Sequence, residues 1–151
     1  MKPSGTPPPE RFAPGGRRVL DAQWLAYLVQ TKRIGDGSGI ESPDLLGRGI
    51  AEFNAMEFRA SHETWEGLWV NSSYPDRLFL LALTKFGAGF AHAQRHNAKG
   101  VRHLLGDALR FARPFSPEYA GINMSRLISD VDAWLVSGGL GPPYPELRTV
   151  S

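Results

Sequence analysis

The sequence contains no cysteine, no long uncharged hydrophobic run and no large excess of either charge. The absence of cysteine excludes disulfides, thiolate metal ligands and a thiol nucleophile. The most apolar long stretch, residues 78–94, carries Lys85 and His92, which favours a buried helix over a membrane span. The first residues, MKPSGTPPPERFAP, lack the apolar segment of a secretory signal. We therefore expect a cytoplasmic protein that does not bind a membrane.

What the chain does contain is enough for one domain of ordinary composition. Its 151 residues are 42% hydrophobic and 21% charged, and the formal net charge is +2. A single buried core is expected for this length and composition. Residues 1–16 hold five of the twelve prolines and three glycines, which is incompatible with a regular helix or strand. This segment is therefore predicted to be a disordered tail.

Apolar residues at helical spacing, bounded by turn formers, account for most of the remaining chain. Residues 17–41 are predicted to form an N-terminal helix followed by the glycine-rich linker GDGSG. Ser42, Pro43 and Asp44 have the residue types of an N-cap, a first helical position and an acidic first turn, so a helical domain begins there. The helices expected in this domain, residues 42–138, cover residues 43–56, 57–70, 76–96, 98–112 and 125–136.

The fold class follows from what separates these helices. Prolines, glycines and other turn-forming residues end each of them, and residues 139–151 are expected to be an extended C-terminal tail. No alternating strand pattern bounded by hairpin turns is present. The prediction is an all-α protein, a compact bundle of about five helices after the N-terminal helix, without a sheet.

One predicted helix places ionisable groups among large apolar side chains, in the segment FNAMEFRASHETWEGLW. At about 100° per residue, His62, Glu66 and Trp69 fall on one face, whereas Glu63 falls at its edge. The histidine and Glu66 are therefore predicted to point inward. An unpaired buried carboxylate is costly, and residues four apart on a helix are neighbours, so His62 is expected to pair with Glu66.

The following helix, residues 76–96, offers further partners for this pair. Lys85 and His92 are seven residues apart and share a stripe with small residues that let another helix approach closely. The predicted functional cluster consists of His62, Glu66, Trp69, Lys85 and His92. The residues expected to support it are Phe53, Asn54, Phe58 and Glu63, with Phe53 and Trp69 packed in the core around it.

Three blocks of the chain resemble the bacterial and archaeal family called domain of unknown function 309. They are FNAMEFRASHETWEGLW, then HAQRHNAKG, then PEYAGINMSRLISDVDAWL, and the resemblance covers about residues 43–136. The family hallmark HxxxExxW is present as His62, Glu66 and Trp69. The resemblance implies a compact helical fold, no established activity and a suggested metal-binding role for the motif. Lys85 stands where the family leads us to expect glutamine, and its ammonium would repel a metal cation.

Several interpretations of the cluster stay open. The favoured one is a structural or interaction role for a buried His–Glu–Lys network, and another is a small-ligand pocket. The alternative is a metal-dependent hydrolase or metal-binding protein centred on His62 and Glu66, with His92 as a third ligand for zinc or manganese. HETWE resembles the zinc-protease pattern HExxH, in which Glu63 would be the general base.

A basic stripe offers a different function. The predicted helix over residues 98–112 and the residue after it carry Lys99, Arg102, Arg110 and Arg113 on one face, with Gly106 at its centre. Four such cations could hold phosphates. A solvated face is the usual meaning of this pattern, and no stacking aromatic residue lies within the stripe. Nucleic acid is therefore not an expected partner, and a homo-oligomer is left open.

Overall fold

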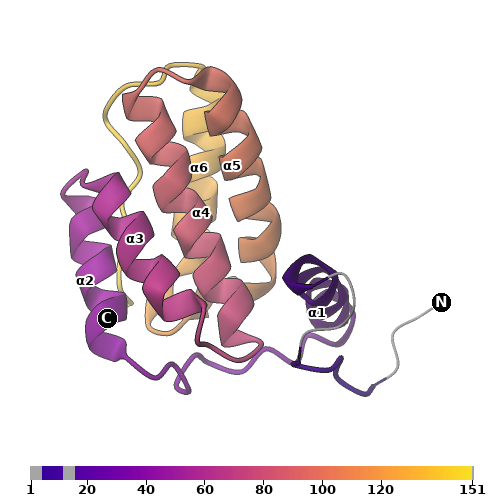
Figure 1. Ribbon diagram of the computed structural model, residues 1–151. Helices are drawn as coiled ribbons and strands as arrows, with labels where there is room; N and C mark the ends of the chain where they lie inside the picture. Colours follow the sequence, from indigo (N-terminus) through magenta and orange to yellow (C-terminus); the bar gives the residue numbers. More distant parts are fainter. Residues whose placement is uncertain (1–4, 12–15, 151) are drawn as a thin grey trace.

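The computed structural model describes residues 5–11 and 16–150. Six α-helices, one short 3₁₀ helix and a small two-stranded sheet occur within these ranges (Figure 1). The all-α class is confirmed, and no helix of the described residues is long and apolar enough to cross a membrane. The helical elements are α1 (Arg17–Thr31), α2 (Pro43–Asn54), α3 (Phe58–Trp69), α4 (Asp76–Gln94), α5 (Ala98–Ala112), η1 (Arg113–Phe115) and α6 (Met124–Ser137).

Side-chain caps fix where several of these helices begin. The Ser42 hydroxyl accepts a hydrogen bond from the Leu45 amide at 3.3 Å, and Pro43 opens α2 as predicted. After α4, His96 and not Asn97 has a left-handed conformation, with φ of 57°. The Asn97 side chain instead caps α5 by accepting from the Gly100 amide at 3.1 Å.

The prediction that the domain contains no sheet is wrong. Strands β1 (Glu118–Tyr119) and β2 (Ile122–Asn123) pair in antiparallel register. The two residues between them, Ala120 and Gly121, have φ of 51° and 76°, which is the two-residue hairpin turn with positive φ at both positions. Alanine is an unusual first residue for this turn, so the residue types indicate the hairpin only weakly.

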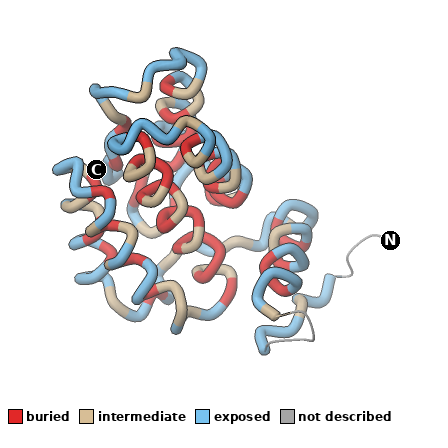
Figure 2. The backbone as a smooth tube through the Cα atoms, turned by 45° about the horizontal axis from the view of Figure 1, so that its top comes forward, coloured by how far each residue is buried: buried red, intermediate tan, exposed pale blue. Residues whose placement is uncertain are grey.

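Helix α4 is the centre of the bundle, and its buried residues run along much of its length (Figure 2). It packs against α3 on one side and α5 on the other. Two glycines of α4 make these approaches close. A Cβ at Gly87 would lie 2.9 Å from the Ser61 hydroxyl oxygen on α3, and a Cβ at Gly89 would lie 2.4 Å from Leu105 Cδ2 on α5.

The segment that follows α6 is extended, and it is attached to the bundle. The Asn54 side chain donates to the Leu147 carbonyl and accepts from the Leu147 amide, each at 2.8 Å. Leu147 is buried, and the Tyr144 ring packs edge-on against Phe58 with centroids 5.2 Å apart. Asn54 therefore supports the fold by joining the end of α2 to this segment.

Helix α1 stands to one side of the other helices (Figure 1). Its inward face is apolar apart from Asp21, and Leu20, Trp24, Tyr27 and Leu28 are buried. The predicted disordered tail, residues 1–16, lies partly outside the described residues, since 1–4 and 12–15 are not described. Within residues 5–11, the Pro9 carbonyl accepts a hydrogen bond from the Trp24 indole at 3.2 Å.

Candidate functional site

Helix α3 turns a different face to the core from the one predicted. Its buried residues are Phe58, Ser61, Trp65 and Leu68, which follow the helical i, i+3, i+7, i+10 pattern. His62 and Glu66 lie one position further round the helix, and their side chains are 32% and 51% exposed. The prediction of a buried polar cluster is therefore wrong, because the stripe with Trp65 supplies more apolar surface to the core.

The predicted pairing of His62 with Glu66 is confirmed. The His62 Nε2 atom lies 2.8 Å from a Glu66 carboxylate oxygen, and Nδ1 lies 3.3 Å from the Thr84 carbonyl oxygen of α4. Both neighbours of the ring are hydrogen-bond acceptors, and the neutral imidazole has one N–H, so it can donate to one of them at a time.

The tentative metal ligands lie along one surface groove, which we call the α3–α4 groove. It has a volume of about 450 Å³. Its lining residues are Arg59, His62, Glu63, Glu66, Ala88, Ala91, His92 and Arg95. Within residues 5–11 and 16–150, no group of three or more histidine or acidic side chains is placed to hold a metal ion. The set His62, Glu66 and His92 is therefore not assembled as a metal site.

The other groups in this groove have separate contacts. Glu63 forms an exposed ion pair with Arg59 at 3.4 Å, so it does not hold the position of a general base beside a metal-bound water. The Nδ1 atom of His92 lies 3.0 Å from the Asn97 side-chain amide. The groove consequently offers a surface His–Glu pair bordered by arginines.

Lys85 and Trp69 are not part of that groove. The Lys85 ammonium lies 3.5 Å from the Asp107 carboxylate of α5, and not beside Glu66 as predicted. Both residues line a separate cavity of about 530 Å³, which we call the α1 cleft because α1 forms one of its walls. Its lining residues are Arg17, Arg18, Asp21, Ala22, Trp69, Leu81, Lys85, His103, Asp107, Arg110 and Phe111.

The α1 cleft has an excess of positive charge. Its four formal cations are Arg17, Arg18, Lys85 and Arg110, and its two acids are Asp21 and Asp107. With His103 neutral, four cations and two acids leave two positive charges. Asp107 lies between two of the cations, 3.5 Å from Lys85 and 3.7 Å from Arg110. The cleft therefore favours an anion.

Trp69, the last residue of the HxxxExxW motif, is partly buried at one side of this cleft. The guanidinium carbons of Arg77 and Arg17 lie 4.9 and 5.3 Å from its ring centroid, within the range of cation–π contacts. Its indole Nε1 is buried, and no acceptor for it is present among the described residues. A buried donor without an acceptor destabilises a protein by about 1 to 3 kcal/mol.

The floor of the cleft holds a buried carboxylate that the sequence analysis did not single out. Asp21 accepts a hydrogen bond from the Tyr74 hydroxyl and lies 4.0 Å from Arg77. Burial raises the pKa of Asp21, against the opposing effects of the Tyr74 hydrogen bond and the Arg77 charge. Burial and the neighbouring Asp21 also raise the pKa of Tyr74. No signal in the sequence indicated this site, because α1 precedes a glycine-rich linker and its packing against the domain is not evident from the residue pattern.

The basic stripe is divided between different surroundings. Lys99 and Arg102 are exposed, as the solvated interpretation predicts. Arg110 lines the α1 cleft, and Arg113 forms an ion pair with Asp132 of α6 at 3.3 Å. One cation of the stripe is therefore placed at the cleft.

Part of the chain matches a known family. Residues 46–104 match the model of the family described as Domain of unknown function (DUF309). The matched region begins within α2 and ends within α5, so it contains His62, Glu66, Trp69, Lys85 and His92, while α1 lies outside it. No curated protein matches the chain.

Proposed function

We propose that this chain, whose residues 46–104 match the DUF309 family model, is a binding module that holds a phosphate monoester in the α1 cleft. The observation that carries the proposal is the excess of two positive charges around a partly buried tryptophan in a cavity of about 530 Å³. A phosphate monoester carries a charge of about −1.5 to −2 at neutral pH. The charge of the ligand would therefore match that of the cleft.

The types of donor in the cleft also suit phosphate. Arginine presents several N–H groups in a planar fork, which is the arrangement that binds phosphate oxygens most directly. The N-terminus of α1 adds to this preference. Its first turn contains no acidic residue, its N-cap is Gly16 without a side-chain cap, and Arg17 and Arg18 follow. The partial positive charge of a helix N-terminus favours an anion.

The lining residues support binding more than catalysis. The α1 cleft has no serine, threonine or cysteine among its described lining residues, so it offers no hydroxyl or thiol nucleophile. Its carboxylates are engaged in other contacts, Asp21 with Tyr74 and Asp107 with Lys85. The cations of the cleft would position and neutralise an anion without a covalent step.

Isothermal titration of the full chain with methyl phosphate tests the proposal. We expect saturable binding that weakens in high salt and that falls at least about tenfold in Lys85→Gln or Arg110→Gln, since a hydrogen bond to a charged group contributes about 1.5 to 3 kcal/mol. Acetate should bind more weakly than methyl phosphate.

Arg126→Gln is the matched control, because Arg126 pairs with Asp130 on the surface of α6, away from the residues that line the cleft. This variant should bind methyl phosphate like the wild type. No saturable binding, or equal losses in Arg126→Gln and Lys85→Gln, would overturn the proposal.

A further inference from the structure

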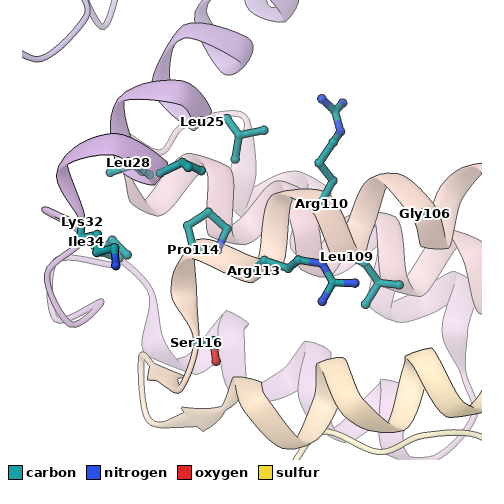
Figure 3. Close-up of a pocket in the computed structure, with 11 residues that line it drawn as sticks. Leu25, Leu28, Lys32, Ile34, Gly106, Leu109, Arg110, Arg113, Pro114 and Ser116 are labelled. Carbon is teal, nitrogen blue, oxygen red and sulfur yellow. The ribbon is translucent and has the colours of Figure 1, made fainter. Parts of the chain in front are cut away.

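A second hollow, larger and more apolar, adjoins the α1 cleft. We call it the α1–α5 groove, and its volume is about 880 Å³. It lies between the C-terminal half of α1 and the region where α5 passes into η1 (Figure 3). Its lining residues are Leu25, Leu28, Val29, Lys32, Ile34, Gly106, Leu109, Arg110, Arg113, Pro114 and Ser116. Arg110 lines both hollows, so they meet at this side chain.

The α1–α5 groove combines an apolar lining with charge of one sign. Leucines, isoleucine, valine and proline provide most of its lining, and Val29 is 59% exposed. Lys32, Arg110 and Arg113 are its charged residues, and no acidic side chain lines it. An apolar chain attached to an anionic group complements this combination, whereas a zwitterionic or cationic molecule does not.

The same face of α1 continues from one hollow into the other. Arg18 and Ala22 line the α1 cleft, and Leu25 and Val29 line the α1–α5 groove. These four residues follow the i, i+4, i+7, i+11 pattern of one helical stripe. Along this stripe the helix is therefore cationic at its N-terminal end and apolar toward its C-terminal end.

From this arrangement we infer that the ligand of the α1 cleft is a single-chain alkyl phosphate monoester whose hydrocarbon chain occupies the α1–α5 groove. The inference rests on the proposed function, because the phosphate in the cleft fixes where the chain begins. The chain passes Arg110 and lies among Leu25, Leu28 and Leu109. The volume of the groove is within the range of small-molecule pockets, about 300 to 1,000 Å³.

Two positions on the groove allow the inference to be tested. A Cβ at Gly106 would meet no atom within 4 Å. The Gly106→Leu side chain can therefore fill part of the groove without a clash at its Cβ. Val29 is exposed on α1, so Val29→Glu places a carboxylate at the groove while leaving the buried side of α1 unchanged. Gly67→Leu on α3 is the matched control, because Gly67 also has no neighbour within 4 Å and lies outside the groove.

The experiment is a titration of the full chain with methyl, butyl, hexyl and octyl phosphate, each below its critical micelle concentration. In the wild type and in Gly67→Leu, affinity should rise by about fourfold for each buried methylene. Gly106→Leu and Val29→Glu should lose most of this rise while still binding methyl phosphate. Lys85→Gln should weaken the binding of every member of the series.

The outcomes separate the two proposals. If methyl phosphate binds and chain length adds nothing, the inference about the groove is wrong and the proposed function stands. If octanol binds as tightly as octyl phosphate and Lys85→Gln changes neither, the proposed function fails and the inference fails with it. If Gly106→Leu does not fold, the test depends on Val29→Glu. A full rise in affinity with chain length in Val29→Glu would overturn the inference about the groove.

Discussion

The indole ring of Trp24 stacks on the phenol ring of Tyr74, with centroids 5.0 Å apart and ring planes 7° from parallel. Trp24 belongs to α1, and Tyr74 precedes α4. The same tyrosine donates a hydrogen bond to Asp21, a second residue of α1. Two contacts to one ring thus hold α1 against the bundle, and both hollows described above have α1 as a wall.

Trp24→Ala should destabilise the protein strongly. Trp24 is 5% exposed, and truncating a buried aromatic side chain costs about 3 to 5 kcal/mol. Trp69, which was predicted to pack in the core, is only partly buried. Urea unfolding should show the larger loss for Trp24→Ala, with Val29→Ala as an exposed control on α1. A smaller loss for Trp24→Ala than for Trp69→Ala would contradict this ranking.

Two glycines of α2 should respond in opposite directions to the same substitution. A Cβ at Gly49 would lie 2.1 Å from the Trp65 indole nitrogen, whereas a Cβ at Gly47 meets nothing within 4 Å. Alanine is favoured over glycine in a helix by about 1 kcal/mol. Gly47→Ala should therefore raise the melting temperature, and Gly49→Ala should lower it through overpacking. Equal shifts for both variants would show that α2 and α3 are not packed this closely.

Asn54→Ala should weaken the attachment of the C-terminal segment to α2. The substitution removes both hydrogen bonds to Leu147, a buried residue, and leaves a backbone amide and carbonyl without their partner. We expect a loss of about 1 to 3 kcal/mol in the free energy of unfolding, together with faster hydrogen exchange at residue 147. Asn71→Ala, at an exposed turn position, is the control, and a comparable loss there would refute the assignment.

Asp21 should make stability depend on pH in the acidic range. Burial raises its pKa above the usual 3.8, so the folded state binds this proton more tightly than the unfolded state does. The contribution of Asp21 to stability is then greatest below pH 3.8 and falls as the pH rises through the raised pKa.

This dependence can be measured as the stability of the wild type minus that of Asp21→Asn in urea titrations across that range. The difference should fall as the pH rises. Asp132 is a half-exposed carboxylate on α6. The stability of the wild type minus that of Asp132→Asn, measured over the same pH range, provides the comparison. A difference for Asp21 that rises with pH would have the wrong sign for a carboxyl group whose pKa is raised by burial.

His62→Ala separates a surface pair from a metal site. Because the His62 and Glu66 side chains are 32% and 51% exposed, we expect a loss of less than about 1 kcal/mol. Added zinc or manganese should change the melting temperature of neither the wild type nor the variant. Arg59→Gln, which removes the other i, i+4 pair of α3 with Glu63, should cost a similar amount. A zinc-dependent rise that disappears in His62→Ala would restore the metal interpretation.

The helices could be predicted from the sequence because their limits are set locally. Ser42 and Pro43 begin α2 with their own side chains, and Gly138 ends α6 in a left-handed conformation. The hairpin over residues 118–123 could not be predicted in the same way. Its strands contain two residues each, and Ile122 also pairs with Thr149, which is a contact between segments distant in sequence.

The candidate site depended on non-local packing, and this is why its prediction failed in part. Spacing alone identified the pair His62 and Glu66, because residues four apart always face each other on a helix. It could not decide which of two adjacent stripes of α3 faces the core. That choice is set by how Trp65 fits against Gly49 of α2. The partner of Lys85, Asp107, is on α5, and α1 forms the wall of the cleft that contains Trp69. Neither contact can be predicted from the residue spacing within a single helix.

The two hydrogen bonds between Asn54 and Leu147 span 93 residues of sequence, which has a consequence for the order of folding during synthesis. A ribosome adds about 5 to 20 residues per second, so roughly 5 to 20 seconds separate the synthesis of α2 from that of its partner. During this interval the helices α2 to α5 can form and pack, but the Asn54 amide has water as its only partner. The contact between Asn54 and Leu147 therefore forms only after the C-terminal segment has been synthesised, and a prematurely terminated chain would expose the surface that Leu147 covers.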